Sequence, residues 1–391
     1  MRSGLLITLT GLLVILLIDI IIYLFFKKSI KRYKFVNLCF WSITALTFIA
    51  IITLNIIMPK LNGPKIYPPI EAVIGIISIF YAPKIFLVLF KIISRIIKIF
   101  SKVGAIVVNY ISFSLSILLL FAMIYGFTLG RYDYVINTTN IELPNLPSSF
   151  KNFKIVQLSD LHLGSVEPNY PGIAKLVKMT NAQHPDLILF TGDMINNFAS
   201  EMDNWIDVLS KLKAKYGKYA ITGNHDYGDY SRWESLVDKR KNMRQYYKNM
   251  KSAGFIMLNN TNTILRVGTD SICLAGVENW GKPPFPQYGK LDKAIEGCDK
   301  FTILMSHDPS QWNAQIIGKD LPLTLSGHTH AMQMGIKLWG WKWSPAKYIY
   351  PEYDGLYKKN NQYLYVSRGQ GYIGIPGRIG LRPELTVLIL K

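Results

Sequence analysis

The chain has 391 residues, of which 50% are apolar, and its 44 Lys and Arg residues outnumber 25 Asp and Glu residues to give a formal net charge of +19. Residues 1–131 hold 14 basic and 2 acidic residues, a net of +12, in a region that is otherwise almost wholly apolar. Charge placed in this way does not form the basic domain face that binds nucleic acid. We therefore expect no nucleic-acid partner and a membrane-associated chain instead.

Four apolar stretches in this region are long enough to cross a bilayer, which takes about 20 residues. They cover roughly residues 5–26, 35–58, 69–90 and 103–129. The third contains Pro83 and Lys84, so it either crosses or ends early at the interface. The first is too long for a signal peptide and lacks a cleavage motif, which favours a retained helix. The sequence therefore predicts a transmembrane region of about four helices over residues 1–131.

The basic residues of this region indicate its orientation in the membrane. They gather in the connections at 27–34 and 91–102, whereas the connection between the second and third stretches has only Lys60 and Lys65. Basic loops stay on the cytoplasmic side. An even number of helices then places the rest of the chain outside the cytoplasm. If the third stretch did not cross, the rest of the chain would lie on the other side.

Asp19 is an ionisable residue within the first apolar stretch. Placing an ionisable group in a bilayer costs free energy, and such a group often has a function. A hydrogen bond buried in the helix bundle, or a side chain that reaches toward the basic loop, explains it without a transport role. We favour that structural interpretation.

The three cysteines allow two interpretations. Cys39 lies in a membrane stretch, while Cys273 and Cys298 lie in the C-terminal part. An oxidising compartment would permit a disulfide between the last two, and two buried free thiols fit the sequence equally well. The spacing is not that of a zinc site.

After a linker at 132–152, which carries Pro144 and Pro147 and one expected edge strand, the pattern changes to alternating strands and helices. Short apolar runs predict strands at 155–158, 187–190, 219–221, 301–305, 323–325, 363–366 and 385–390. Periodic segments predict helices at 172–183, 202–213 and 232–253. This alternation is typical of an α/β layered fold over residues 153–391.

Five of the six histidines fall in short blocks that directly follow predicted strands. The blocks are Asp160-Leu161-His162, Gly192-Asp193, Gly223-Asn224-His225-Asp226, Ser306-His307-Asp308 and Gly327-His328-Thr329-His330. Imidazole, carboxylate and amide oxygen form the ligand set of a divalent metal site. If the strands stay extended, residues two apart share a face and converge on one sheet edge, while the glycines allow tight turns. His184 fits no block, and we expect it in a surface loop.

The order of these blocks resembles the calcineurin-like metallophosphoesterase family, from about Phe153 to the C-terminus. Within the family, the chain resembles a membrane-anchored bacterial subgroup and envelope phosphoesterases of the UDP-2,3-diacylglucosamine pyrophosphatase type. The resemblance implies a four-layer αββα sandwich preceded by the helical membrane region. One departure is Ala331-Met332-Gln333, where similar bacterial proteins usually have Gly-Gly-Gln.

The resemblance also implies two metal ions that share one carboxylate. One ion would be held by Asp160, His162, Asp193 and His330. The second would be held by Asp193, Asn224, His307 and His328. The metal is Mn, Fe, Zn or Ni, because all four accept these ligand types. His225 would stay off both metals.

Chemistry explains these residue types independently of the family. Two cations about 3.5 to 4 Å apart can bind phosphate oxygens and make a nucleophile of water, and a bridging carboxylate such as Asp193 sets their separation. The leaving alkoxide needs a proton, which His225 can supply at neutral pH, with Asp226 as its orienting partner. The amide of Asn224 limits negative charge around an anionic substrate.

Two segments near the C-terminus are candidates for substrate and membrane contacts. Residues 339–343 alternate tryptophan with glycine and lysine, which suits either the lipid headgroup boundary or a loop folded over the domain's own core. Arg378 is a candidate for phosphate contact, since similar proteins bring this tail near the active site. Surface salt bridges are the alternative for Arg378 and for its neighbours Arg368 and Arg382.

The sequence leaves two functions of different class. The first is a membrane-anchored, metal-dependent phosphoesterase that acts outside the cytoplasm on a phosphodiester, pyrophosphate or phosphomonoester, with a lipid-linked substrate. The second is a membrane receptor or assembly protein that binds metal in the same fold without turnover. The presence of His225 beside a full ligand set favours the enzyme.

Overall fold

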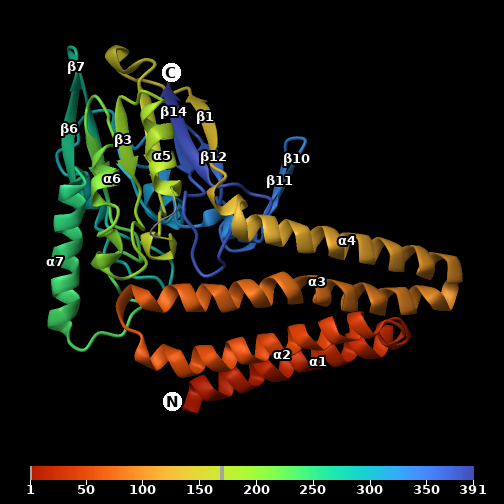
Figure 1. Ribbon diagram of the computed structural model, residues 1–391. Helices are drawn as coiled ribbons and strands as arrows, with labels where there is room; N and C mark the ends of the chain where they lie inside the picture. The colour runs from red at the N-terminus through yellow and green to blue at the C-terminus, as the bar shows by residue number, and fades with distance from the viewer. Residues whose placement is uncertain (1, 168–170) are drawn as a thin grey trace. The chain divides into compact units, whose positions relative to one another are not determined.

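The computed structural model describes residues 2–167 and 171–391, and these form two compact units (Figure 1). The helical unit runs to Thr128 and includes Gly374–Pro376. The C-terminal unit comprises Leu129–Ile373 and Gly377–Lys391. The metal-ligand candidates all lie in the second unit.

Four long helices make up the helical unit. They are α1 (Arg2–Arg32), α2 (Lys34–Ile57), α3 (Tyr67–Phe100) and α4 (Lys102–Thr128). All four are long and apolar enough to cross a membrane. The third stretch, whose crossing the sequence leaves open, is part of one continuous helix that runs through Pro83. Only short 3-10 turns, Met58–Lys60 and Gly63–Ile66, connect α2 to α3.

A buried polar cluster inside this unit accounts for the charges of Asp19 and Lys84. Asp19 is fully buried. Its carboxylate accepts hydrogen bonds from Thr44 Oγ1 at 2.6 Å, Tyr81 OH at 2.7 Å and Lys84 Nζ at 2.6 Å. Asp19 and Lys84 thus neutralise each other, which is how charged groups persist between membrane helices. The interpretation of Asp19 as a buried, hydrogen-bonded residue is confirmed.

Two six-stranded sheets form the C-terminal unit. The first sheet has the strand order β1-β14-β2-β3-β4-β5, and β2 to β5 run parallel. Its strands are β1 (Val135–Ile141), β14 (Glu384–Leu390), β2 (Lys154–Leu158), β3 (Leu187–Phe190), β4 (Lys218–Ala220) and β5 (Ile256–Met257). The strand in the linker, β1, lies at the edge of this sheet and pairs with β14.

The second sheet has the order β12-β13-β9-β8-β7-β6, with parallel pairing from β7 through β13. Its strands are β12 (Gly355–Lys359), β13 (Gln362–Val366), β9 (Leu323–Ser326), β8 (Thr302–Met305), β7 (Asp270–Gly276) and β6 (Thr261–Val267). A separate hairpin consists of β10 (Ile336–Leu338) and β11 (Trp341–Trp343).

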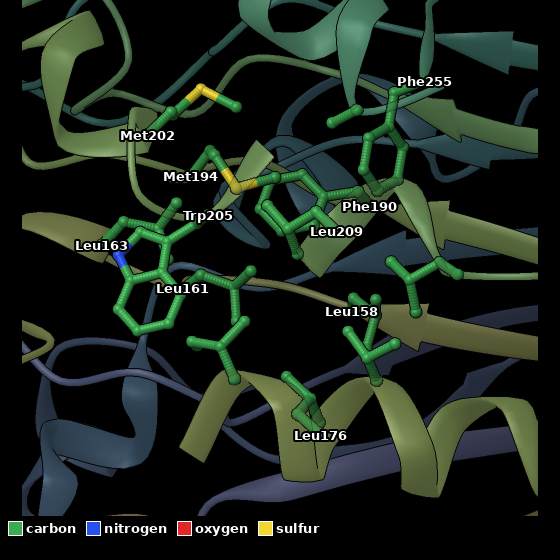
Figure 2. Packing of buried hydrophobic residues seen from close by; sticks show 14 of the residues in the cluster. Leu158, Leu161, Leu163, Leu176, Phe190, Met194, Met202, Trp205, Leu209 and Phe255 are labelled. Carbon is green, nitrogen blue, oxygen red and sulfur yellow. The ribbon is translucent and has the colours of Figure 1, made fainter. Parts of the chain in front are cut away.

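Alternating side chains of the strands build three buried layers. Ile155 of the first sheet packs in one cluster with Leu323 of the second, which places the sheets face to face. The next residue, Val156, points the other way into the helix-covered cluster. Helices α5 (Gly172–Asn181), α6 (Ile206–Ser210) and α7 (Leu236–Ser252) cover that outer face, where Phe190 lies among leucines and methionines (Figure 2).

The opposite face of the second sheet is covered by α8 (Leu291–Ala294) and the π turn Trp312–Ile316. The order of layers is therefore helix, sheet, sheet, helix, and the expected four-layer sandwich is confirmed. The helix expected over 202–213 is shorter than predicted, because the segment is divided into the 3-10 turn Ala199–Met202 and α6. Helix α7 begins after Ser235, whose side chain accepts from the backbone N–H of Asp238.

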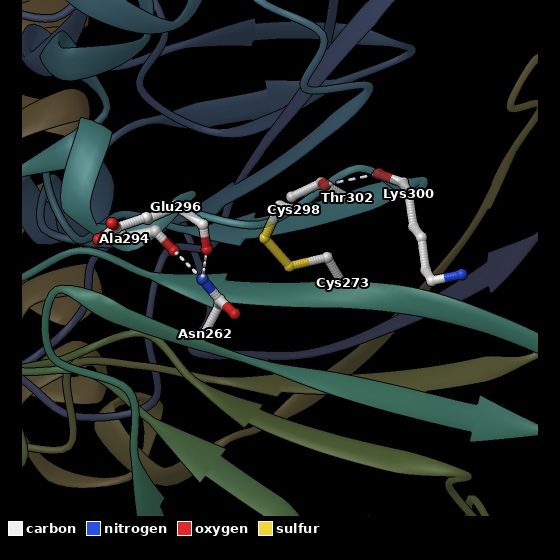
Figure 3. Close-up of a disulfide and its surroundings, with 7 residues drawn as sticks. All are labelled: Asn262, Cys273, Ala294, Glu296, Cys298, Lys300 and Thr302. Atoms are coloured by element: carbon white, nitrogen blue, oxygen red, sulfur yellow. Dashed lines mark hydrogen bonds between the residues drawn. A yellow bond between two sulfur atoms is a disulfide. The ribbon is translucent and has the colours of Figure 1, made fainter.

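A disulfide joins Cys273 of β7 to Cys298, which lies just before β8 (Figure 3). The two Cα atoms are 5.7 Å apart, within the range that a disulfide spans. Of the alternatives that the sequence leaves open, the structure thus has the bridged form. Cys39 is a free thiol.

Candidate metal centre

The polar blocks meet at one edge of the sandwich because the strands that precede them end there. Strands β2, β3 and β4 of the first sheet and β8 and β9 of the second are each followed by one block. Potential ligand atoms then gather in two groups, each within 4.8 Å. The first group is Asp160, His162 and His330, and the second is Asp193, His307 and His328.

In the first group, two imidazole nitrogens face each other. The Nε2 atoms of His162 and His330 are 3.0 Å apart, and Asp160 Oδ1 lies 3.4 Å from His330 Nε2. On the other side of the His162 ring, Nδ1 faces the amide oxygen of Asn196 at 2.9 Å. Because that oxygen only accepts, Nδ1 carries the proton and Nε2 presents a lone pair. Donor atoms converging in this way fit a cation.

The second group shows the same arrangement. The Nδ1 atom of His307 faces the carbonyl oxygen of Thr191 at 2.7 Å, so Nδ1 carries a proton and Nε2 is the atom turned toward the other candidates. His307 Nε2 lies 3.1 Å from Asp193 Oδ2 and 3.1 Å from the Oδ1 atom of Asn224. His328 Nδ1 reaches the same Asn224 oxygen at 2.8 Å. Nitrogen and oxygen acceptors therefore surround one point, as a divalent metal requires.

Asp193 lies between the two groups. Its Oδ2 atom is 3.1 Å from His307 Nε2 in the second group and 3.7 Å from His162 Nε2 in the first. Its Oδ1 atom accepts the backbone N–H of His225 at 2.9 Å. Of the candidates, this carboxylate is the one placed to serve both groups.

The local backbone differs from the extended geometry that the sequence suggested. Asp160, His162, Asp193, His328 and His330 all have positive φ, between 47° and 71°. Residues other than glycine rarely adopt a positive φ, because it strains the backbone. Backbone strain of this kind is concentrated at functional sites. The condition of an extended backbone beyond the strand ends is thus not met, and left-handed turns bring the ligand candidates together instead.

Gly192 shows how closely these turns approach each other. Its φ is +100°, and an added Cβ would lie 2.6 Å from the backbone nitrogen of Gly223 and 2.7 Å from Nδ1 of His307. A side chain at this position would therefore collide with a second ligand-bearing turn. The glycine allows the blocks after β3 and β4 to pack together.

The carboxylates of the pocket stabilise positive charge on His307, whereas burial disfavours it on His328 and lowers the pKa of that imidazole to about 4. Burial opposes a charged His307, but the carboxylates of Asp193 and Asp160 outweigh it and raise the pKa of His307 to about 10. Burial also disfavours the Asp193 carboxylate, yet the surrounding imidazoles hold the pKa of Asp193 well below its usual range. Burial lowers the pKa of His162 to about 3, which keeps it as the neutral imidazole that binds metals.

His225 lies beside the ligand groups and belongs to neither. Its ring meets that of His162 edge to face, with centroids 5.0 Å apart. Its Nδ1 atom faces the carbonyl oxygen of Asn196 at 3.0 Å, so Nε2 is the atom that remains for proton transfer. This position agrees with the separation of His225 from the metal ligands that the resemblance implies.

Asp226 has a different environment from the one expected. Its carboxylate accepts backbone N–H groups of Asp193 at 2.9 Å, Met194 at 2.9 Å and Gly223 at 2.8 Å. Its hydrogen bonds thus fix the turn that carries Asp193, and the partner of the His225 ring is a backbone carbonyl. Asp226 supports a metal-ligand candidate rather than orienting the expected acid.

Arg378 is also placed differently from the expected phosphate contact. The side chain is only 2% exposed. Its guanidinium donates to the carbonyl oxygens of Arg368 at 2.7 Å and Gly371 at 2.6 Å, and one nitrogen lies 3.2 Å from His330 Nδ1. Arg378 therefore supports the chain behind His330. Of its neighbours, Arg382 forms a half-exposed ion pair with Asp133 at 2.7 Å.

Arg368 forms buried ion pairs with Asp354 at 3.1 Å and Glu384 at 2.9 Å. These contacts join the segment after β13 to the start of β14 and to the segment before β12. Arg368 therefore has a structural position in the sandwich. His184, the histidine outside the blocks, is exposed as expected.

Two functional residues carry no signal in the sequence pattern. Asn196 contacts both His162 and His225, and its Nδ2 donates to Ser165 Oγ at 3.0 Å. Glu201 fixes the loop that carries Asn196, since its carboxylate accepts the backbone N–H groups of Asn196 at 2.5 Å and Asn197 at 3.0 Å. A single Asn and a single Glu are too common to be noticed without the fold.

We expect Asn196→Ala to lower kcat/KM about 10- to 100-fold, the usual effect of removing a residue that orients a metal-binding histidine. His162 would lose the acceptor that fixes its tautomer. The measurement is hydrolysis of a soluble phosphodiester over a range of manganese concentrations, with the exposed Asn361→Ala as the matched control. Wild-type activity at low manganese would show that Asn196 does not orient His162.

The C-terminal unit combines a four-layer α/β sandwich with buried nitrogen and oxygen donors at its strand ends, which defines the class of metallophosphoesterases. The family model described as calcineurin-like phosphoesterase matches residues 153–332. A second model, described as the transmembrane domain of a probable calcineurin-like phosphoesterase, matches residues 1–131. This chain belongs to the calcineurin-like phosphoesterase family.

Relatives in animals and bacteria support this assignment. The chain is 35% identical over 268 residues to a transmembrane protein with metallophosphoesterase domain from Bos taurus, a match that covers 65% of this chain and 56% of the relative. The protein of the same name from Danio rerio is 30% identical, with 68% and 60% covered. The metallophosphoesterase YkuE of Bacillus subtilis (strain 168) is 32% identical, with 68% and 90% covered. The chain thus spans less than two thirds of the two animal relatives.

Proposed function

We propose that the chain hydrolyses a phosphodiester, pyrophosphate or phosphomonoester that is linked to a lipid, and that it uses two divalent metal ions. The observation that carries the proposal is the convergence of acceptor atoms on two neighbouring points, with Asp193 between them. Bound metals would supply Lewis acidity toward phosphate oxygens and a nucleophile derived from water. The ligands would be Asp160, His162, Asp193, Asn224, His307, His328 and His330.

The protein's own residues account for the remaining steps. Asn224 offers a neutral oxygen to the second group, so the site gains a ligand without further negative charge against an anionic substrate. His225 has its Nδ1 proton fixed by the Asn196 carbonyl, so Nε2 would give a proton to the leaving oxygen from the imidazolium form of the ring. Burial lowers the pKa of His225 in the free protein, and a bound anionic phosphate would stabilise the imidazolium. A histidine in this position supports turnover over metal binding alone.

Connectivity supports a substrate that resides in a membrane. Helix α4 ends at Thr128 and β1 begins at Val135, so only a short segment links a membrane helix to the sandwich. A catalytic unit tethered in this way stays within reach of lipid head groups. Free access to soluble substrates would not require four membrane helices.

We propose further that the C-terminal unit lies outside the cytoplasm. Most basic residues of the helical unit lie where α1 ends and α2 begins and where α3 ends and α4 begins, and basic residues at the ends of membrane helices stay cytoplasmic. With four membrane crossings, β1 and all later residues lie on the side of the membrane opposite the cytoplasm. The Cys273–Cys298 disulfide agrees with an oxidising compartment.

The proposed activity is tested with the purified full chain, manganese and bis(p-nitrophenyl) phosphate. We expect metal-dependent release of p-nitrophenol that a chelator abolishes. Assays of purified envelope lipids for head-group or phosphate release would then identify the substrate. A preparation that binds manganese but hydrolyses no phosphate ester or anhydride would contradict the proposal and favour a receptor role.

The proposed location predicts the thiol count of protein taken from intact cells. After denaturation without a reductant, we expect a maleimide reagent to modify Cys39 alone, and after reduction all three cysteines. We also expect reduction to destabilise the C-terminal unit by about 3 to 4 kcal/mol, because the bridge closes a loop of moderate length. Modification of three cysteines without reduction would place the unit in a reducing compartment.

A further inference from the structure

The β10–β11 hairpin is amphipathic. Its register pairs Ile336 with Trp343 and Leu338 with Trp341, and partners in an antiparallel pair share a face. One face is therefore apolar and bears Ile336, Leu338, Trp341 and Trp343. The other face bears the pair Lys337 and Lys342. Two strands alone have no second layer to cover an apolar face.

The tip of the hairpin exposes a tryptophan at an unfavourable backbone position. Trp339 is 100% exposed and has a φ of 46°, and Gly340 follows with a φ of 82°. A two-residue turn of this kind favours Asn-Gly, since a bulky side chain is strained at positive φ. A folding role does not explain a tryptophan at this position, whereas a contact of the indole ring with a partner outside the unit explains it.

Exposed apolar side chains are frequent in the segment that contains the hairpin. Among the residues that the structure describes, six large exposed hydrophobic side chains fall between 336 and 349: Ile336, Leu338, Trp339, Trp341, Tyr348 and Ile349. Lysines at 337, 342 and 347 lie between them in the sequence. Tryptophan, tyrosine and lysine together are typical of the interface between lipid tails and water. The composition therefore matches a bilayer surface better than a dry protein interface, which is depleted in lysine.

The base of the hairpin is fixed to the metal centre. Ser344 Oγ donates to the carbonyl oxygen of Ala331 at 2.6 Å, immediately after the ligand candidate His330. Past the hairpin, Tyr350 is buried and its hydroxyl lies 2.8 Å from Nε2 of His328. Both ends of the segment thus contact the site, while its tip points into solvent.

We propose that this hairpin inserts Trp339, with Leu338 and Trp341, into the headgroup boundary of the bilayer, with the exposed Lys337 beside anionic lipid phosphates. Lys342 is instead held by an ion pair with Asp354 at 2.8 Å. The occupant of the apolar face is therefore the membrane in which the chain is anchored by its own helices. The hairpin would hold the metal centre at the depth of the head groups. That last consequence rests on the proposed lipid-linked substrate, whereas the insertion itself does not.

The insertion is tested by fluorescence of the full chain in vesicles whose lipids carry bromine high on the acyl chain. We expect brominated lipid to quench less tryptophan fluorescence in Trp339→Asn than in wild type. The difference between the two proteins is the contribution of Trp339. Trp233→Phe is the matched control, since Trp233 is half-buried and donates Nε1–H to the Gly228 carbonyl at 2.7 Å. This variant should show the same quenched fluorescence as wild type. Equal quenching in wild type and Trp339→Asn would overturn the proposal.

The same variant separates membrane contact from folding. Asparagine suits this turn better than tryptophan, so the melting temperature of the C-terminal unit should stay the same or rise. If Trp339→Asn instead lowered the melting temperature, Trp339 would be a structural residue and the proposal would fail. A structural role and a membrane role thus predict opposite results.

Activity separates this proposal from the proposed function. The substrates are soluble bis(p-nitrophenyl) phosphate and a diacylglycerol phosphodiester of p-nitrophenol in vesicles, which share a leaving group. We expect Trp339→Asn to lower turnover of the lipid about tenfold and to leave the soluble ester unaffected, because only positioning is lost. Equal loss on both substrates would contradict membrane positioning. A wild type inactive on both would refute the proposed function, while the quenching result would stand.

Discussion

Asp193→Asn is expected to abolish phosphoesterase activity, with a loss of at least about a thousandfold in kcat, since it removes the charge that both proposed metal positions would share. Asp193 Oδ2 lies near imidazoles of both groups, at 3.1 Å from His307 and 3.7 Å from His162. An amide keeps the shape of the side chain and supplies no negative charge. The variant should therefore also bind less metal. Metal content by mass spectrometry and turnover of bis(p-nitrophenyl) phosphate measure the two effects.

The control for this substitution is Asp320→Asn, which changes an exposed carboxylate in the same way. It should keep both the metal content and the turnover of wild type. If Asp193→Asn retained full metal content and lost less than about tenfold in kcat, Asp193 would not be a shared ligand. The placement of two metals around it would then be wrong.

His225→Gln is expected to reduce kcat about 10²- to 10⁴-fold on alkyl phosphodiesters without a change in metal content. Its Nδ1 atom is fixed by the Asn196 carbonyl at 3.0 Å, and the ring lies outside both ligand groups. The loss should be smaller for p-nitrophenyl esters, because p-nitrophenolate leaves without a proton. The dependence of rate on leaving-group pKa, compared between wild type and variant, is the measurement.

His184→Gln is the matched control for His225→Gln, since His184 is exposed and lies outside every block. It should leave kcat unchanged on all esters. An equal loss for His225→Gln on alkyl and p-nitrophenyl esters would show that His225 does not act as the acid. Loss of metal in this variant would instead make His225 a ligand.

The sequence predicts the fold, because the fold depends on local patterns, and the candidate ligands that it singles out lie close together in the structure. Each ligand block directly follows an apolar run, and those runs form β2, β3, β4, β8 and β9. Parallel strands of one sheet end at a common edge, and the face-to-face packing of the two sheets then brings Asp160, after β2, close to His330, after β9. The four membrane helices follow in the same way from length and hydropathy.

The remaining features depend on contacts that no local pattern encodes. The left-handed turns at Asp160 and His162 are fixed by packing against other blocks, so an extended backbone is the natural but incorrect expectation. The backbone groups that Asp226 and Arg378 contact belong to loops, and the sequence does not predict how these loops fold. Asn196 becomes noticeable only through the two histidines that it orients.

The helical unit gives a further example of this limit. Asp19 and Lys84 each look like an isolated charge in an apolar stretch, and the sequence alone does not pair them. In the structure they are 2.6 Å apart, with Tyr81 and Thr44 as additional donors. Long-range pairing of this kind requires knowledge of how the helices pack.

The central claim is that the site binds two metal ions around Asp193, and a low-temperature electron paramagnetic resonance titration with Mn²⁺ tests it most directly. We expect the six-line signal of isolated Mn²⁺ to be replaced by a spin-coupled spectrum as about two equivalents bind, because the two ions share a carboxylate. Asp193→Asn should lose the coupled spectrum. A wild-type titration that ends at one equivalent, with an uncoupled six-line spectrum throughout, would contradict the account.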